Sequence, residues 1–112
     1  MKQIQIGDLF TQSFVVTQIH TAKHLGSGNL DVFATPAMIA CMENTALKLV
    51  QSCLEPGFDT VGTEICANHL KASKIGETIV FEARIIAYEG KKIQFEISAK
   101  NELDATIGKA NL

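Results

Sequence analysis

The sequence predicts an α+β fold in which an antiparallel sheet wraps one long helix. Three features predict it: a β-rich stretch near the N-terminus, one long apolar helical segment from about residue 35, and apolar–polar alternation with period two after residue 57. The chain has 112 residues, which is one domain's worth. We therefore expect a single domain over residues 1–112.

The first half of the chain is expected to contain one strand, a turn-rich loop and the helix. The strand lies within residues 4–19, and the loop that follows carries the turn-forming cluster Gly-Ser-Gly-Asn at 26–29. Thr35 before Pro36 is a helix start signal, because Thr caps free amides and Pro is favoured in the first turn. The helix is expected to end near residues 53–57, where a Pro-Gly pair cannot continue it.

The second half is expected to form a run of antiparallel strands. Strand candidates cover residues 61–73, 77–89, 91–100 and 105–112, with a turn at 101–104. The clearest alternation is in the third of these, whose apolar face carries Ile93, Phe95, Ile97 and Ala99. A long helix followed by such a meander is typical of a sheet folded around a helix.

Composition excludes several classes of protein. Ten Lys and Arg are outnumbered by 12 Asp and Glu, the net charge is −2, and the cations are scattered, so no nucleic-acid partner is expected. No apolar run approaches the roughly 20 residues of a membrane helix, and the first residues lack a signal peptide's apolar core, so we expect a cytoplasmic protein and no membrane partner. Cys41, Cys53 and Cys66 are widely spaced, which favours free, buried or half-buried thiols over a zinc site or disulfides.

Glu43 interrupts the apolar helix. On a helical wheel with Thr35 at zero, Glu43 falls at about 80°, on the shoulder of the apolar arc. Residues within about 60° of Thr35 form that arc: Ile39, Met42, Ala46, Leu49 and Val50. A carboxylate there needs a partner, hydrogen bonds or water from a cleft. The alternative is that the helix boundaries shift and Glu43 lies at the surface.

His69 is the second candidate, because it ends a largely apolar face of the 61–73 strand. It is either a satisfied core or edge histidine or a proton-transfer group suited to neutral pH. Thr35, Glu43 and His69 would converge if the helix packs on this strand. His20 and His24 flank the turn-rich loop and are expected to be solvated or to line a cleft.

The segments "VFATPAMIACMENTA" and "VGTEICANHLKAS", with "YEGKKIQFEISA" and "ATIGKA", resemble the hotdog-fold thioesterase family that includes fluoroacetyl-CoA thioesterase. The resemblance covers about Gly7 to Gly108. It implies a hotdog fold, two subunits paired side by side, and an active site in a cleft at the dimer interface. It also implies that Thr35, Glu43 and His69 are the catalytic groups.

The chain departs from this family in two places. The segment between His24 and Phe33 is short and has no aromatic residue before Phe33, whereas the fluoroacetyl-specific enzyme has a longer, aromatic lid. This argues against fluoroacetyl-CoA as the substrate. The sequence also stops at "IGKANL", where family members continue with a full strand, so a short last strand and an altered sheet edge are expected.

The predicted reaction is hydrolysis of an acyl-CoA thioester, most simply one with a short acyl chain. Amides at the helix start form an oxyanion site, and Ala37 and Met38 are the expected donors because Pro36 has no N–H. His69 acts as general base and then acid. Glu43 either orients His69 and activates water or attacks to form an anhydride, and Thr35 donates a hydrogen bond or acts as nucleophile.

Two exposed lysines, Lys71 and Lys74, are expected to meet the CoA phosphates. No metal or cofactor is expected to be required. Two other readings of the same groove stay open from the sequence: a non-catalytic acyl-CoA-binding hotdog module and a hotdog hydratase.

Overall fold

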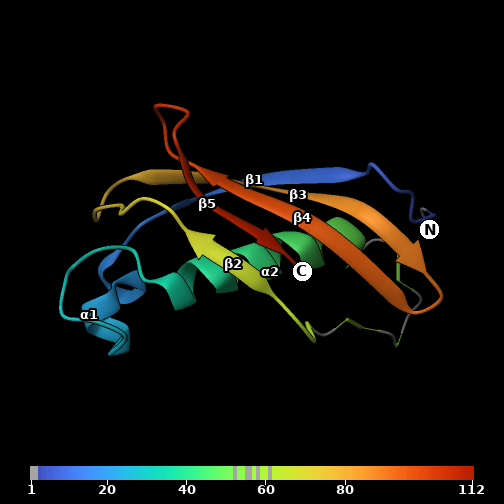
Figure 1. The fold of residues 1–112 in the computed structure, drawn as a ribbon, viewed down its shortest axis with the longest axis horizontal. Helices are drawn as coiled ribbons and strands as arrows, with labels where there is room; N and C mark the ends of the chain where they lie inside the picture. The colour runs from blue at the N-terminus through green and yellow to red at the C-terminus, as the bar shows by residue number, and fades with distance from the viewer. Residues whose placement is uncertain (1–2, 52, 55–56, 58, 61) are drawn as a thin grey trace.

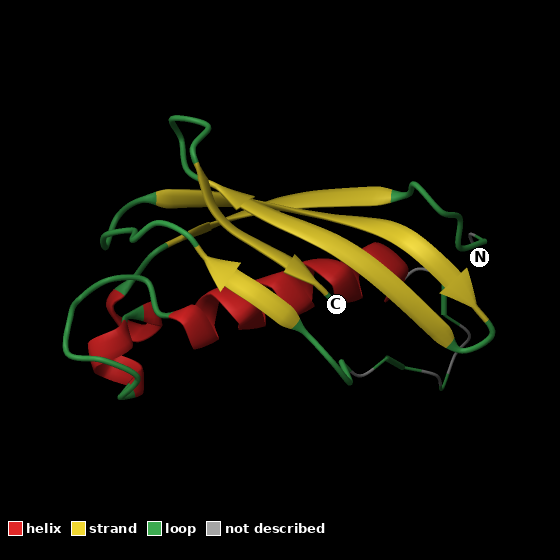
Figure 2. Ribbon diagram, viewed as in Figure 1, coloured by secondary structure: helices red, strands yellow, loops and turns green. Residues whose placement is uncertain are grey.

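One long helix lies against a single antiparallel sheet in the computed structural model of the chain (Figure 1, Figure 2). The model describes residues 3–51, 53–54, 57, 59–60 and 62–112. The elements are β1 (Leu9–Val15), η1 (Gln18–His20), α1 (Ala22–Leu25), α2 (Thr35–Gln51), β2 (Cys66–His69), β3 (Thr78–Glu89), β4 (Lys92–Lys100) and β5 (Thr106–Asn111). The sheet order is β1-β3-β4-β5-β2, with every neighbouring pair antiparallel. The predicted α+β class is confirmed.

The sheet buries one face of each central strand against α2. The residues that form this inner face are Ile79, Phe81, Ala83 and Ile85 of β3, Phe95, Ile97 and Ala99 of β4, and Ile107 and Ala110 of β5. The period-two alternation therefore predicted the inner face of β4, although Ile93 at its start is only half-buried. β2 is much shorter than the predicted 61–73 strand, and β5 pairs with both β2 and β4.

The buried face of α2 differs from the predicted apolar arc. It consists of Ala37, Met38, Cys41, Met42, Thr45, Ala46 and Val50. The face is turned by roughly 60° from the predicted one, and Ile39 and Leu49 are only half-buried at its margins. Small side chains explain the difference, because Ala37 and Cys41 let the helix approach the sheet closely. At that contact Met38 packs onto Gly108, where an added Cβ would lie 2.5 Å from the methionine sulfur.

The loop before α2 folds into two short helices that the sequence pattern did not predict. Thr21 caps α1 by accepting a hydrogen bond from the His24 N–H at 3.2 Å, and α1 ends at Gly26 in the left-handed conformation. The Ala34 N–H donates to the His20 carbonyl at 2.8 Å, which fastens this segment to the start of α2. The segment therefore lies as a wall beside the N-terminal end of α2 (Figure 1).

Other predictions have mixed outcomes. α2 ends at Gln51, and part of its predicted end at 53–57 lies outside the described residues. The predicted 101–104 turn is confirmed, with the Asn101 side chain accepting from the Leu103 and Ala105 N–H groups. The cysteines are free, but Cys66 is exposed rather than buried. Within the described chain, no helix combines the length and apolarity needed to cross a membrane.

Candidate active site

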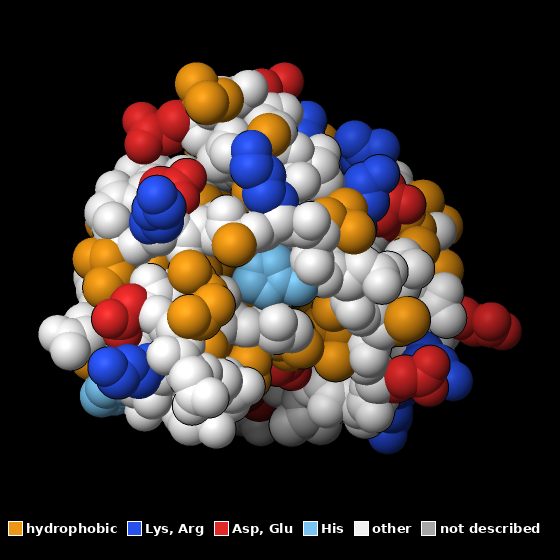
Figure 3. All heavy atoms as spheres, turned by 60° about the vertical axis from the view of Figure 1, so that its left-hand side comes forward, with side chains coloured by type: hydrophobic (Ala, Val, Ile, Leu, Met, Phe, Trp, Pro, Cys, Tyr) orange, Lys and Arg blue, Asp and Glu red, His pale blue; other side chains and the backbone are white. Residues whose placement is uncertain are grey.

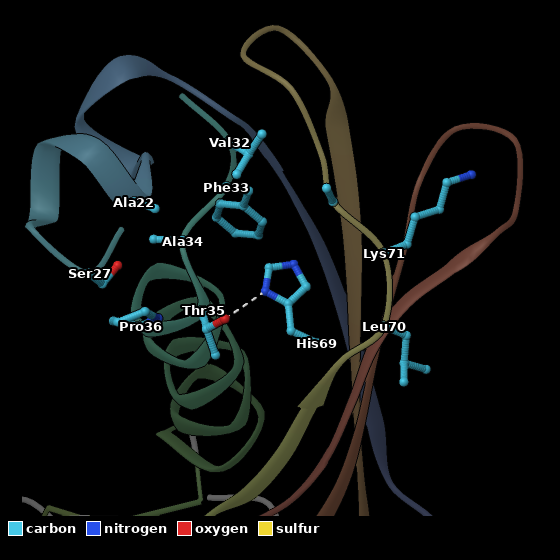
Figure 4. Close-up of a pocket in the computed structure, with 11 residues that line it drawn as sticks. Ala22, Ser27, Val32, Phe33, Ala34, Thr35, Pro36, His69, Leu70 and Lys71 are labelled. Atoms are coloured by element: carbon cyan, nitrogen blue, oxygen red, sulfur yellow. Dashed lines mark hydrogen bonds between the residues drawn. The ribbon is translucent and has the colours of Figure 1, made fainter. Parts of the chain in front are cut away.

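Thr35 and His69 meet where the start of α2 faces the end of β2. The Thr35 hydroxyl and Nδ1 of His69 are 2.9 Å apart, a hydrogen-bond distance (Figure 4). Thr35 is the first residue of α2, and His69 is the last residue of β2, which pairs with β5. Two of the three predicted catalytic side chains therefore come together within one chain.

The His69 ring is held by packing and is partly desolvated. Phe33 lies edge-on to it, with ring centroids 6.2 Å apart, and Phe33 also packs on Phe81 in the core. Burial lowers the pKa of the His69 imidazole, and the backbone of Lys71 opposes this shift. Nε2 of His69 is enclosed and has no hydrogen-bond partner among the described residues. The Lys71 backbone therefore lies near the ring but outside hydrogen-bond geometry. The resting ring is thus favoured in the neutral form that accepts a proton.

A mainly apolar cavity opens beside this pair. Its volume is about 340 Å³, and its lining residues are Ala22, Ser27, Val32, Phe33, Ala34, Thr35, Pro36, His69, Leu70, Lys71 and Ala72. The cavity is surrounded by the segment that contains η1 and α1, by the start of α2 and by the end of β2 (Figure 4). Figure 3 shows this side of the molecule, where an imidazole ring is visible among apolar side chains. The cavity therefore offers apolar space next to the Thr35–His69 pair.

Glu43 does not join the pair within one chain. It lies eight residues after Thr35, a rise of about 12 Å along the helix. The side chain is exposed, and its carboxylate lies beside Gly62, where an added Cβ would be 2.6 Å from Oε2. The predicted position on the shoulder of a buried arc is therefore wrong, because the buried face of α2 is turned away from Glu43.

Only one of the two predicted oxyanion donors has an N–H group that is free to donate within the described chain. The Met38 N–H donates to the Ala34 carbonyl at 2.9 Å, and the Met38 side chain is fully buried, so the prediction for Met38 is wrong. The Ala37 N–H has no backbone partner in the described part of the chain. One free amide at a helix start, close to the positive end of the helix dipole, suits a developing oxyanion.

The predicted phosphate contacts lie at or near the cavity rim. Lys71 lines the cavity but its amine points away from His69 (Figure 4). Lys74 is exposed, and its backbone N–H donates to Glu77. Both lysines have the exposure that the prediction requires, and their contact with CoA stays a prediction.

Sequence reasoning missed two residues that lie against the candidate catalytic side chains, Phe33 beside His69 and Gly62 beside Glu43. Phe33 and Gly62 carry no charge and gave no chemical signal, although each lies within a motif quoted above. His20 is half-buried rather than solvated, with Nδ1 3.0 Å from the Thr17 N–H and its ring 6.3 Å from Phe33. His24 is exposed, as predicted.

Comparison with known proteins places this geometry in context. Residues 16–112 match the family model of FlK, described as fluoroacetyl-CoA-specific thioesterase. The fluoroacetyl-CoA thioesterase of Streptantibioticus cattleyicolor is 32% identical over 107 residues, which cover 90% of this chain and 77% of that protein.

Solved structures agree with the sequence match. A mutant of the fluoroacetyl-CoA-specific thioesterase FlK, in complex with fluoroacetate and CoA, superposes with a TM-score of 0.90 at 31% identity, covering 96% of this chain and 91% of that one. A hypothetical protein of Thermus thermophilus, a thioesterase superfamily member, gives a TM-score of 0.90 at 29% identity, covering 99% and 82%. The expected hotdog architecture is thereby confirmed.

Proposed function

The chain belongs to the fluoroacetyl-CoA-specific thioesterase family, and from this premise we propose that it hydrolyses short acyl-CoA thioesters at a site shared by two protomers. It is a thioester hydrolase: water adds to the carbonyl carbon, the C–S bond breaks, and the products are the acid and free CoA. The thiolate that leaves takes up a proton. This reaction requires no cofactor or metal.

The hydrogen bond between Thr35 and His69 is the observation that carries the proposal. A thioester seated in the cavity would present its carbonyl to the start of α2, where the Ala37 N–H is free to stabilise the oxyanion. Nδ1 of His69 would accept a proton from the attacking water, either through the Thr35 hydroxyl or directly after that hydroxyl has rotated away. His69 would then donate the proton to the sulfur of the leaving thiolate.

The size of the cavity supports a short acyl group. Its volume of about 340 Å³ is at the low end of the roughly 300–1,000 Å³ typical of small-molecule sites. The reacting end of the CoA arm must share this space with the acyl chain. The relative with CoA and fluoroacetate bound supports an acyl-CoA substrate. Nothing aromatic in the 24–32 segment encloses a two-carbon group, so we do not restrict the substrate to fluoroacetyl-CoA.

Glu43 enters this site only if a second copy supplies it. Each chain holds two separate half-sites: Thr35 within hydrogen-bond distance of His69, and the Glu43 carboxylate beside Gly62. A two-fold axis near Ile39 of α2 would run two α2 helices antiparallel and set Thr35 of one chain opposite the partner's Glu43. The same axis would bring His69 of one chain near the partner's Gly62. Each Thr35–His69 half-site would then face the partner's Glu43, so the dimer would hold two complete sites.

The edge of the sheet offers a surface for such a pairing. β2 is an edge strand, and the Leu70 N–H donates to the Ile107 carbonyl on the β5 side at 2.7 Å. Backbone groups alternate along a strand, so those of Ala67 and His69 turn to the free edge. An unpaired edge is a ready template for another strand. A homodimer joined along β2 would pair these free backbone groups. It would also cover the side of α2 on which Thr35, Ile39 and Glu43 lie.

In this dimer the partner's Glu43 would act beside His69 in one of two ways. It would activate the attacking water as a general base, or it would attack the carbonyl and form an anhydride that water then opens. Isotope found in the Glu43 carboxylate after a single turnover in H₂¹⁸O would identify the anhydride route. Only the anhydride route can place the isotope in the Glu43 carboxylate.

Mixing two inactive variants tests the shared site. His69→Ala and Glu43→Gln are each expected to be inactive as homodimers. In a heterodimer, one site carries both changes and the other carries neither, so random mixing should restore about a quarter of the wild-type activity. Thr35→Ala mixed with His69→Ala is the matched control, because both changes fall in the same half-site and no intact site can form.

Restored activity in the control pair, or none in the test pair, would reject the shared site. So would light scattering that shows a strictly monomeric, active protein.

Release of free thiol from an acyl-CoA panel of increasing chain length, with fluoroacetyl-CoA included, measures substrate choice. Binding without thiol release would indicate a non-catalytic module, and a change at the acyl double bond alone a hydratase. A cytoplasmic location belongs to the same proposal.

A further inference from the structure

Among the described residues, two buried side-chain polar atoms lack a hydrogen-bond partner: Nε2 of His69 and Oγ of Ser73. Ser73 is fully buried, at 0% exposure. Such orphaned atoms are rare in folded proteins, and a shared internal water is a common explanation for them. The two orphans lie four residues apart, His69 at the end of β2 and Ser73 in the loop that follows it.

Both residues pack against Phe33. The Ser73 carbonyl accepts a hydrogen bond from the Phe33 N–H at 2.8 Å, and the Phe33 ring lies 6.2 Å from the His69 ring. Nε2 of His69 points away from Thr35, toward the chain segment that follows Lys71 (Figure 4). Ser73 lies in that segment. One water with ordinary hydrogen bonds bridges two polar atoms that lie about 5–6 Å apart.

The partner of Nε2 decides which proton the catalytic pair can move. A neutral imidazole carries its proton on one nitrogen only. If the proton is on Nδ1, the ring donates to Thr35 and cannot accept from it. If the proton is on Nε2, Nδ1 is free to accept the proton of the Thr35 hydroxyl, which lies 2.9 Å away. An N–H enclosed without an acceptor would disfavour this second, active form.

We propose that Ser73 is a positioning residue for the catalytic histidine, acting through one internal water that links its hydroxyl to Nε2 of His69. The water accepts a hydrogen bond from the Nε2–H group and donates one to the Ser73 hydroxyl, which keeps Nδ1 as the acceptor facing Thr35. This inference rests on the proposed role of His69 as the base. It goes beyond that role by assigning its tautomer to a residue outside the cavity lining.

The backbone of Lys71 is the competing acceptor. It lies close enough to the ring to stabilise the protonated form, but outside hydrogen-bond geometry. A substitution at Ser73 leaves the Lys71 backbone in place. The two explanations therefore give different results when the Ser73 hydroxyl is removed.

Imidazole ¹⁵N NMR on the resting, substrate-free protein tests the proposal. The chain has three histidines, and the His69 signals are assigned by their loss in His69→Gln. We expect wild type to show the Nε2–H tautomer. Ser73→Ala should shift the ring toward the Nδ1–H tautomer, and kcat should fall by at least about tenfold with KM within about twofold, because the wrong tautomer cannot accept the proton.

Ser73→Cys is the second variant, since it fills nearly the same space with a weak hydrogen-bonding group and should change the tautomer in the same direction. Thr45→Val is the matched control: it removes another fully buried hydroxyl, one that bonds Gln12 and the Cys41 carbonyl, and it should lower Tm without changing the tautomer.

An Nδ1–H tautomer in wild type would overturn the proposal. So would an unchanged tautomer in Ser73→Ala or Ser73→Cys, which would assign the control to Lys71. A rise in Tm with unchanged kcat would mean that the hydroxyl is simply unpaired. The NMR result holds even if no acyl-CoA is hydrolysed, so failure of the proposed function is recognised separately, as absence of thiol release.

Discussion

Gly62→Ala should reduce activity strongly and leave the fold intact. An added Cβ at this position would lie 2.6 Å from Oε2 of Glu43 and 3.5 Å from the Leu112 side chain. The Leu112 contact is ordinary, so the carboxylate is the group that must yield. Gly62 is not among the glycines with positive φ, so alanine fits its backbone.

The size of the effect follows from the distance. To reach an ordinary contact of 3.4 Å, the carboxylate must move by about 0.8 Å. A misplacement near 1 Å in a catalytic group can cost roughly a hundredfold in rate. Within one chain the movement itself is cheap, because Glu43 and Gly62 are both exposed there and the carboxylate is the free end of a flexible side chain. We therefore expect kcat to fall by roughly one to two orders of magnitude while Tm stays within a few degrees.

Thiol release from a short acyl-CoA measures kcat and KM, and thermal unfolding measures Tm. Thr63→Ala is the matched control, because it changes the next exposed residue without adding an atom near Glu43. Wild-type kcat in a folded Gly62→Ala protein would refute the reasoning, since the Glu43 carboxylate would then tolerate displacement. A large fall in Tm would show instead that the contact is structural.

Three further predictions concern titratable groups. Glu43→Gln should lower kcat by at least about a hundredfold with little change in Tm, because an exposed carboxylate adds little stability; near-normal turnover would contradict its role. Burial lowers the pKa of His69 from the usual 6.5, whereas the partner's Glu43 beside the ring would oppose this shift, so kcat/KM should fall as the pH drops through the apparent pKa of the pair, and His69→Ala should remove that limb. In Glu43→Gln, where the carboxylate is gone, burial makes the unfolded chain bind this proton at higher pH than the native one, so the free energy of unfolding should decline as the pH falls below about 6.5, less so when His69→Ala is added. Burial raises the pKa of Cys41 to about 11, so in a Cys53→Ser, Cys66→Ser background its thiol should resist alkylation at pH 8 until the protein unfolds, as read by mass spectrometry.

The sequence predicted the fold class because its strongest patterns are local. Alternation in β4 and the run of apolar residues in α2 require only neighbouring residues to be read. The boundaries were less predictable. β2 has four residues rather than 13, because regular pairing with β5 begins only at Cys66 and involves Asn111, which is 45 residues away. Long-range pairing of this kind leaves no local signal.

The face of α2 was misjudged for a similar reason. Hydrophobicity ranks Ile39 and Leu49 above Ala37 and Cys41, so the wheel centred the arc on the larger side chains. Close packing favours the smaller ones at the contact with the sheet, where Gly108 leaves room for Met38. A wheel measures apolarity and does not measure how closely a helix can approach its neighbour.

This rotation changes what the charge at Glu43 means. In a single chain Glu43 costs little, because it is exposed and lies on the stripe of α2 that the core leaves free. That stripe has Thr35 at one end, Glu43 at the other, and half-buried Ile39 between them. A two-fold axis through its middle matches each polar end with the opposite polar end and the apolar centre with itself. In the proposed dimer, association would then come from the centre and the chemistry from the ends. The wheel therefore singled out Glu43 as a buried charge within one chain, whereas its proposed role depends on the surface that the chain presents to its copy.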